Sequence, residues 1–390
     1  MIQTRTAVTR AIDEPEQAVS EILEQLDLAG EGKPQAHAIG IVSCFAEYIE
    51  TGVLEKLRAR LPFDLAGATT IAGSAAGEIG ETVLILTMLT SDDVAFATAV
   101  SDAVLEEEEA PLRACYERAA AKLPGAPTFM LSFSPLLTKV GGDYYVDRVS
   151  AISGGIPNFG TLAVDHNADY HDSLVILNGE SWRDRYVMLL MSGDVNPGFC
   201  FGTISDKKLF SEKGVVTASE GNQLLTVNGA PVVEYLQSLG LRRDADGSIT
   251  GINSFPIIVD YNDGTKPAVR AMFAITPEGY AVCGGNIPVG ATLSIGAFDP
   301  EEILETTRRT VKEALAAGRH TFMLIYSCIG RYFAQGYNQE AEMEIVKSEL
   351  ESAGVPYMMA YSGGELCPVY LRDEKVINRN HNNTLIVCAF

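Results

Sequence analysis

A strand that ends in Ser-Cys occurs twice in this chain, and this repeat limits the fold more than any single motif does. Apolar residues 37–42 lead into Ser43-Cys44, and residues 321–326 lead into Ser327-Cys328. A Gly-Glu pair follows each thiol, with Glu78 coming 34 residues after Cys44 and Glu365 coming 37 residues after Cys328. Both segments predict the order strand, helix, strand and polar tip, and such a repeat indicates a fold built by duplication.

A third copy of the strand is found in residues 128–134, which match residues 321–327 at five of seven positions. Ser153-Gly154-Gly155 follows it, without the glutamate. Three similar segments in one chain predict that their strand tips serve related purposes.

Strands and helices alternate in the repeated segments, while residues 196–298 contain mostly short strands and turns. The sequence therefore predicts an α/β fold class with two related halves, internally duplicated strand-helix-strand units and an antiparallel β-rich middle. We place the first domain at residues 1–220 and the second at residues 221–390. We also expect a hairpin around residues 91–93, and a long helix with Asp299 as its N-cap.

The acidic composition excludes several classes of partner. The chain has 29 basic and 51 acidic residues, a net charge of −22, so nucleic acid and anionic membranes are not expected partners. No apolar run reaches the roughly 18 residues that span a bilayer, and the N-terminus lacks the apolar core of a signal peptide. We therefore expect a cytoplasmic protein. The seven cysteines include no Cys-x-x-Cys and predict neither disulfides nor a zinc site.

The last two strand tips carry the groups that an amino-acid ligand needs. Arg331 follows the strand that ends at Cys328, and Glu365 follows the next strand. A guanidinium binds a carboxylate through two hydrogen bonds, and a carboxylate binds an ammonium group. Gly363 and Gly364 would let backbone N–H groups approach the ligand. In the alternative interpretation, Arg331 and Glu365 pair with each other and brace the two strands.

The other strand tips extend the predicted site. His381 and Asn383 precede the last strand and either line the same pocket or form an ordinary turn. The predicted ligand-binding residues are Ser74, Gly77, Glu78, Gly154, Gly155, Ser327, Cys328, Arg331, Gly363, Gly364, Glu365, His381 and Asn383.

Catalysis and metal binding have less support in the sequence. Residues 165–172 hold two histidines amid three aspartates, but their spacing suits neither a helix face nor a strand face, so we expect a solvated loop and no metal. Cys44 and Cys328 are potential nucleophiles, yet no base lies near either in the sequence. Nucleotide-binding P-loop and hydrolase motifs do not occur in the sequence. We predict no catalytic residues and no enzymatic activity.

The ordered set of motifs resembles the FIST family. Residues 67–79 are similar to that family's Gly-Glu signature, with Ser74-Ala75 where the family often has Ser-Thr. Ser153-Gly154-Gly155 and residues 327–331, 363–365 and 381–384 complete the resemblance. It places a FIST N-terminal domain over roughly residues 37–220 and a FIST C-terminal domain over roughly 230–370.

The resemblance implies a sensory module of intracellular signalling that binds a small-molecule ligand such as an amino acid. FIST domains are often joined to, or encoded beside, histidine kinases, methyl-accepting proteins or cyclic-dinucleotide enzymes. We expect a histidine kinase or a cyclic-dinucleotide enzyme to act as the partner in trans, because the two halves use the 390 residues. Two alternatives stay open: a nitric-oxide sensor with noncovalent haem on His381, and a thiol-dependent enzyme using Cys328. Otherwise we expect no cofactor.

Overall fold

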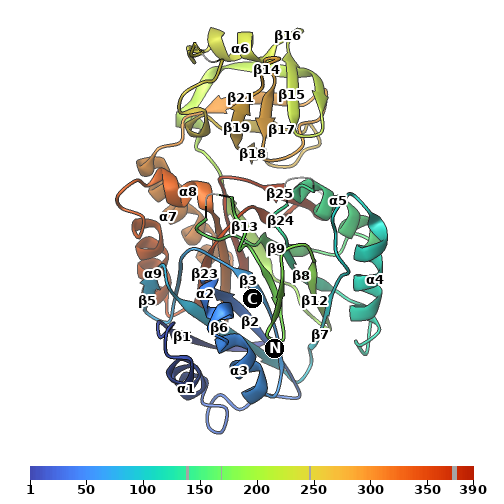
Figure 1. Ribbon diagram of the computed structural model, residues 1–390, viewed down its shortest axis with the longest axis vertical. Coiled ribbons are helices and arrows are strands. Elements are labelled where there is room, and N and C mark those ends of the chain that lie inside the picture. The colour runs from blue at the N-terminus through green and yellow to red at the C-terminus, as the bar shows by residue number, and fades with distance from the viewer. Residues whose placement is uncertain (138–139, 168, 246, 371–375) are drawn as a thin grey trace.

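Three six-stranded sheets make up the larger part of the molecule (Figure 1). The computed structural model describes residues 1–137, 140–167, 169–245, 247–370 and 376–390. The three sheets have the strand orders β1-β6-β2-β3-β10-β11, β7-β12-β8-β9-β24-β25 and β13-β26-β22-β23-β4-β5. In each sheet the third and fourth strands are parallel and the other neighbours are antiparallel. We call this assembly the three-sheet body.

Each sheet corresponds to one repeat unit with the same order of elements along the chain. Unit 1 contains β1 (Gln3–Thr9), α1 (Pro15–Leu26), β2 (His37–Cys44), α2 (Glu47–Glu50), α3 (Val53–Arg60), β3 (Asp64–Thr69), β4 (Gly73–Ala75), β5 (Glu78–Gly80) and β6 (Leu84–Ser91). Unit 2 contains β7 (Ala95–Val100), α4 (Glu109–Ala120), β8 (Phe129–Ser134), α5 (Gly142–Ser153), β9 (Asn158–Leu162), β10 (Val175–Leu177), β11 (Glu180–Trp182) and β12 (Val187–Ser192).

Unit 3 repeats this order around a large insertion. It contains β13 (Gly198–Gly202), α7 (Pro300–Ala316), β22 (Met323–Cys328), α8 (Ile329–Ala334), α9 (Ala341–Ala353), β23 (Tyr357–Ser362), β24 (Glu365–Tyr370), β25 (Val376–His381) and β26 (Leu385–Ala389). Asp299 caps α7 as predicted, because its carboxylate accepts a hydrogen bond from the Glu302 N–H at 2.9 Å.

No unit completes its own sheet, because each donates a hairpin to a neighbour. The β4–β5 hairpin of unit 1 pairs with β23, the β10–β11 hairpin of unit 2 pairs with β3, and the β24–β25 hairpin of unit 3 pairs with β9. The exchange is cyclic, so the three units are expected to fold together as one cooperative body.

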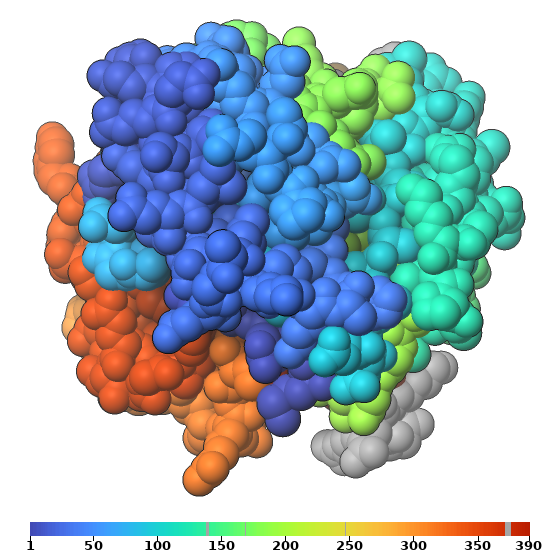
Figure 2. Space-filling view, turned by 90° about the horizontal axis from the view of Figure 1, so that it is seen from below, coloured from blue at the N-terminus to red at the C-terminus, as the bar shows by residue number. Residues whose placement is uncertain are grey.

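The inner faces of the three sheets share one apolar core. Ile41 of sheet 1, Leu131 of sheet 2 and Leu324 of sheet 3 all belong to it. The outer faces are covered by helices: α1 and α3 over sheet 1, α4 and α5 over sheet 2, and α7 and α9 over sheet 3. Seen from below in Figure 2, the blue, teal and orange surfaces of units 1, 2 and 3 lie around one another.

The insertion between β13 and α7 forms a separate domain on the end of the three-sheet body, above β25 and α8 in Figure 1. Its eight strands form a strongly curved sheet around a core of its own. Its elements are η1 (Asp206–Lys208), β14 (Leu209–Glu220), β15 (Gln223–Val227), β16 (Ala230–Pro231), α6 (Val232–Ser238), η2 (Ile252–Ser254), β17 (Ile257–Asp260), β18 (Ala268–Arg270), β19 (Met272–Ile275), β20 (Ala281–Cys283) and β21 (Thr292–Gly296). We call it the inserted domain.

The predicted fold class is confirmed, including the duplicated units and the antiparallel β-rich middle. The domain boundary predicted after residue 220 lies between β14 and β15, inside the inserted domain. The hairpin predicted around residues 91–93 is wrong, because β6 belongs to sheet 1 and β7 to sheet 2. The short turn looks like a hairpin in sequence, but here the chain passes from one sheet to the next.

The two Ser-Cys pairs occupy different positions in their sheets. Val42 and Cys44 pack under the helices, so Ser43 points toward the opposite face. In unit 3, Tyr326 points into the shared core, so Ser327 points toward the helices. Aligning the two Ser-Cys pairs by sequence therefore matches residues that point to opposite faces of their sheets. A shift of one residue along a strand is enough to exchange the two faces.

We predict that Leu324→Ala lowers the free energy of unfolding by about 2–5 kcal/mol, because the side chain is fully buried in the core that all three sheets share. Urea denaturation measures the change. Leu105→Ala is the control, since that side chain is 62% exposed, and it is expected to change stability by less than about 0.5 kcal/mol. Equal effects of the two substitutions would contradict a shared core.

Candidate ligand-binding site

An ion pair between Arg331 and Glu342 lies fully buried beside the end of β22. Arg331 is on α8, which begins directly after the strand, and Glu342 is in the first turn of α9, where the helix dipole favours a carboxylate. Glu342 Oε1 accepts a hydrogen bond from Arg331 Nε at 2.8 Å, and it forms the ion pair with Nη2 at 2.7 Å. A charge-assisted hydrogen bond of this kind fixes the relative positions of the two helices.

Further hydrogen bonds connect this ion pair to the neighbouring elements. Ser327 Oγ and the Tyr361 hydroxyl donate to Glu342 Oε2 at 2.9 and 3.0 Å. Arg331 Nη2 donates to Thr307 Oγ1 at 2.8 Å and to the Ile303 carbonyl at 3.1 Å. The network joins α7, β22, α8, α9 and β23 around one buried carboxylate.

This arrangement changes the role predicted for Arg331 and Ser327. The bracing partner of Arg331 is Glu342, whereas the sequence-based alternative named Glu365. Because Nε and Nη2 are already bound, the guanidinium does not offer a ligand the two-bond fork that the prediction required. Of the three guanidinium nitrogens, only Nη1 lacks a hydrogen-bond partner among the described residues.

Glu365 does lie at the predicted strand tip, with a fully buried side chain. It is the first residue of β24 and pairs with Thr161 of β9 on one side and His381 of β25 on the other. Paired residues share one face of a sheet, so these side chains stand side by side. Burial raises the pKa of Glu365 well above its ordinary value of 4.5, while the charge of Arg331 opposes the shift.

His381 is equally enclosed. Its ring lies against Phe201 of β13, with 4.9 Å between ring centroids. Burial, together with the positive charge of Arg270, lowers the pKa of His381 to about 3. The imidazole is therefore neutral at physiological pH, with one nitrogen as a donor and the other as an acceptor.

Several polar atoms at this strand end make no hydrogen bond of regular geometry within the part of the chain that the structure describes, although the Cys328 thiol, the Thr384 N–H and the Ser362 hydroxyl lie near enough to Glu365 to oppose the rise in its pKa. These polar atoms are both carboxyl oxygens of Glu365, both ring nitrogens of His381, Oδ1 of Asn382 and Nη1 of Arg331. Cys328 and Asn383 lie beside them, with 3.9 Å between the Cys328 sulfur and Asn383 Oδ1. We call Cys328, Arg331, Glu365, His381, Asn382 and Asn383 the tip cluster.

An unpartnered buried polar group costs about 1–3 kcal/mol, and nearly all such groups in native proteins have a protein or water partner. A cluster of them therefore indicates a site that another molecule completes. The cluster offers donors and acceptors at the polar end of an otherwise apolar interior, which is a typical arrangement for a small-ligand site.

The glycines before Glu365 have a structural role. The Gly363 N–H donates to the Leu162 carbonyl at 3.0 Å, and the Leu162 N–H donates to the Gly364 carbonyl at 2.8 Å. The Gly364 N–H is bound by Ser362 Oγ at 3.1 Å. Both backbone donors are thus used inside the protein, contrary to the predicted role of binding a ligand.

The five other predicted residues lie away from the tip cluster. Ala76 and Gly77 both have positive φ and form the turn between β4 and β5, which places Glu78 in an exposed ion pair with Arg10. Ser74 is buried and shares a 2.7 Å hydrogen bond with the Tyr357 hydroxyl.

Gly154 and Gly155 end α5 with positive φ and are exposed, at the opposite end of β9 from its tip. Glu365 corresponds in position to Gly73 of β4 and Val175 of β10, because each is the first residue of a donated hairpin. Their partners on the neighbouring strands are Thr161, Ala360 and Ala68, respectively. Gly-Glu thus recurs in the sequence without recurring in the structure.

Two important residues were missed. Glu342 occupies the same helix face as Val346 and Leu350, so a carboxylate at a buried helical position was the signal for its role. Asn382 gave no sequence signal beyond an ordinary turn.

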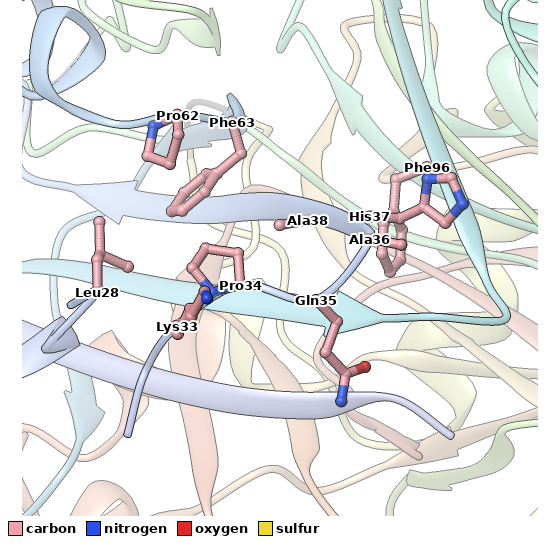
Figure 3. Close-up of a pocket in the computed structure, with 10 residues that line it drawn as sticks. All are labelled: Leu28, Lys33, Pro34, Gln35, Ala36, His37, Ala38, Pro62, Phe63 and Phe96. Atoms are coloured by element: carbon pink, nitrogen blue, oxygen red, sulfur yellow. The ribbon is translucent and has the colours of Figure 1, made fainter. Parts of the chain in front are cut away.

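A separate hollow of about 540 Å³ lies at the start of β2 (Figure 3). His37 and Phe96 lie at one end of it, and Leu28 lies at the other. None of the described side chains that line it is both buried and without a hydrogen-bond partner. The tip cluster is therefore the better candidate site, although it is closed in this structure.

The chemistry of the tip cluster bears on the haem and thiol alternatives. Burial, and then the charge of Glu365, raise the pKa of the Cys328 thiol, so it is not poised as a thiolate nucleophile. His381 is fully buried and packed against Phe201, so its ring is not open to a haem in the closed arrangement.

Comparisons with known proteins give a consistent family assignment. The FIST N domain matches residues 38–230, and the FIST C domain matches residues 232–368. No curated protein matches the chain. A cyanuric acid hydrolase from A. caulinodans aligns over 100% of this chain and 99% of its own, at 10% identity and a TM-score of 0.37.

T. maritima PurL with bound FGAR aligns over 100% of this chain and 72% of its own, at 9% identity and a TM-score of 0.22.

Among the described residues, no helix is both long and apolar enough to cross a bilayer.

We predict that Arg331→Ala lowers the free energy of unfolding by about 3–5 kcal/mol, because it leaves the buried Glu342 carboxylate without its counter-charge. Arg113→Ala removes an exposed ion pair with Glu109 and should cost less than about 1 kcal/mol. Urea denaturation compares the two variants. A small loss for Arg331→Ala would show that the network does not hold these helices together.

We also predict a pH-dependent gain from Glu365→Gln. The folded protein retains a proton on Glu365 that the unfolded chain releases above about pH 4.5, so the wild-type protein loses stability as the pH rises toward the raised pKa. The variant avoids this loss, and its advantage should grow with pH, by at most about 1.4 kcal/mol per pH unit. Urea denaturation between about pH 5 and 7 measures the difference, which a constant value would contradict.

Proposed function

The chain belongs to the FIST family, whose domains are sensory domains of signal-transduction proteins that bind small ligands, and we propose that it binds an amino acid or a related small metabolite at the tip cluster. In this proposal the protein is a sensor without enzymatic activity. It signals to a separate protein, such as a histidine kinase or a cyclic-dinucleotide enzyme.

The observation that carries the proposal is the set of buried polar atoms without partners. Glu365 and Asn382 offer acceptor oxygens, which suit an ammonium group. Arg331 Nη1 and the N–H of neutral His381 are donors, which suit a carboxylate. An α-amino acid carries both groups on one carbon, so it would match acceptors and donors that lie close together.

Ligand binding would also offset the free-energy cost of ionising the buried Glu365 carboxyl group. Burial favours the protonated carboxyl, while a nearby cation favours the ionised form. An ammonium group that enters the cluster supplies that cation, and Glu365 would release its proton as the ligand binds. Affinity for a cationic ligand should therefore increase with pH.

The electrostatics of the cluster favour binding over catalysis. The raised pKa of the Cys328 thiol and the neutral state of His381 leave no thiolate–imidazolium pair. In the absence of ligand the Glu365 carboxyl group is protonated, and it can release this proton when a cation binds beside it.

A thermal-shift screen of amino acids and related metabolites tests the proposal. A ligand present at 100 times its Kd should stabilise the wild-type protein by about 2.7 kcal/mol, and Glu365→Gln should remove most of this gain because the carboxylate partner of the ammonium is lost. Glu78→Gln is the matched control, since it changes an exposed Gly-Glu site with a surface ion pair.

Equal stabilisation of wild type and Glu365→Gln by a bound amino acid would contradict the proposed site. Reconstitution with haem is a separate control: a Soret band that His381→Ala abolishes would favour the haem alternative.

A further inference from the structure

The tip cluster is closed, so a ligand reaches it only if part of the protein moves. Glu365 and His381 are fully buried, and Asn382 is 5% exposed. Asn382 packs directly against Gly284 of the inserted domain, where a Cβ would meet the Asn382 side-chain carbon at 2.8 Å. The inserted domain therefore covers this end of the three-sheet body.

Charged and polar contacts hold the inserted domain on the body near β25. Arg270 of β18 forms a buried ion pair with Asp143 of α5 at 2.9 Å. Its Nη1 also donates to the Asn380 carbonyl at 2.8 Å, and the Asn286 N–H donates to Asp143 Oδ2 at 2.8 Å. We call Asp143, Arg270, Asn286 and Asn380 the latch. Arg379 adds an ion pair with Asp263 of the inserted domain.

A second contact between the inserted domain and the body is apolar and surrounds the two connecting segments. Ile204 and Phe298, one on each connection, pack with Ile258 of the inserted domain and Ile303 of α7. The two segments are tied to the start of α7, since Ser205 Oγ donates to Glu302 Oε2 at 3.0 Å. The inserted domain has a core separate from that of the body. Polar docking at β25 and a tethered apolar contact at the two connections suit a rigid domain that pivots.

Both connections touch the tip cluster directly. Phe201, just before the insertion, lies against the His381 ring, and Phe298, just after it, lies under the Arg331 guanidinium at 5.9 Å. Along β25 and the turn that follows, Asn380 belongs to the latch and accepts from Arg270, His381 faces Glu365, and Asn382 contacts Gly284. A change at the cluster therefore acts on the contacts that hold the inserted domain.

We propose that the inserted domain is a hinged lid over the tip cluster, held closed by the latch, and that its opening and closing is the movement by which the ligand enters and is reported. This inference rests on the proposed function for the identity of the site. The inserted domain would then respond to the ligand, because β25 carries both a latch residue, Asn380, and a residue of the tip cluster, His381.

Alkylation of Cys328 by iodoacetamide, followed by mass spectrometry, tests the lid without requiring a known ligand. The thiol lies in the tip cluster, so its modification rate reports access. Asp143→Ala breaks the latch and should raise the Cys328 rate at least tenfold. Arg113→Ala, which removes an ion pair outside the latch, should leave that rate unchanged. Cys115, a buried residue of α4, reports general unfolding and should react equally in all variants.

A cross-linked variant gives the reverse test. Position 143 faces Gly285 across the latch, so the double variant Asp143→Cys and Gly285→Cys should form a disulfide that holds the lid closed. The oxidised form should modify Cys328 at least tenfold more slowly than the reduced form of the same variant. Equal Cys328 rates in the oxidised, reduced and Asp143→Ala proteins would overturn the lid.

The lid and the ligand site fail in distinguishable ways. If Cys328 access follows the latch but no amino acid stabilises the protein, the lid stands and the proposed ligand class does not. If an amino acid stabilises the protein through Glu365 while the oxidised cross-link leaves both its on-rate and the Cys328 rate unchanged, the site stands and the lid is refuted.

Discussion

The buried ion pair between Arg331 and Glu342 holds together the elements of unit 3 around the end of β22. Two charges removed from water are costly unless each is fully paired, and here Ser327, Thr307 and Tyr361 complete the hydrogen bonding of the carboxylate. The pair holds α8 and α9 at fixed positions beside β22 and β23. Because the ion pair holds these elements together, polar side chains at the ends of the strands do not have to contribute to their packing.

The tip cluster differs from this network in one physical respect. Glu342 has hydrogen-bond partners for both oxygens, whereas neither oxygen of Glu365 makes a hydrogen bond of regular geometry to a described residue, although both carboxyl groups are fully buried. The first arrangement stabilises the fold, and the second leaves a cost that a ligand can remove. Nearby buried glutamates can thus serve opposite purposes, and the hydrogen-bond partners distinguish them where burial does not.

The pseudo-symmetric body gives this difference a context. Three units exchange hairpins and share a core, yet the position of Glu365 is taken by Gly73 and Val175 in the other two sheets. The inserted domain interrupts unit 3 and docks where that unit's hairpin carries His381. A symmetric scaffold has therefore been specialised at one of its three strand ends.

The sequence alone predicted the fold class, the repeated strands, the cap of α7 and the polar tip that follows β23, because these follow from local periodicity and from residue type. It placed Glu365, His381 and Cys328 at one end, which the structure also does. Three other features appear only in the folded molecule: Arg331 binds Glu342, the hairpins are exchanged, and Gly77-Glu78 is a surface turn. Pairing between strands and the partner of a buried charge depend on contacts distant in sequence, and a shift of one residue in a strand reverses which face a side chain occupies.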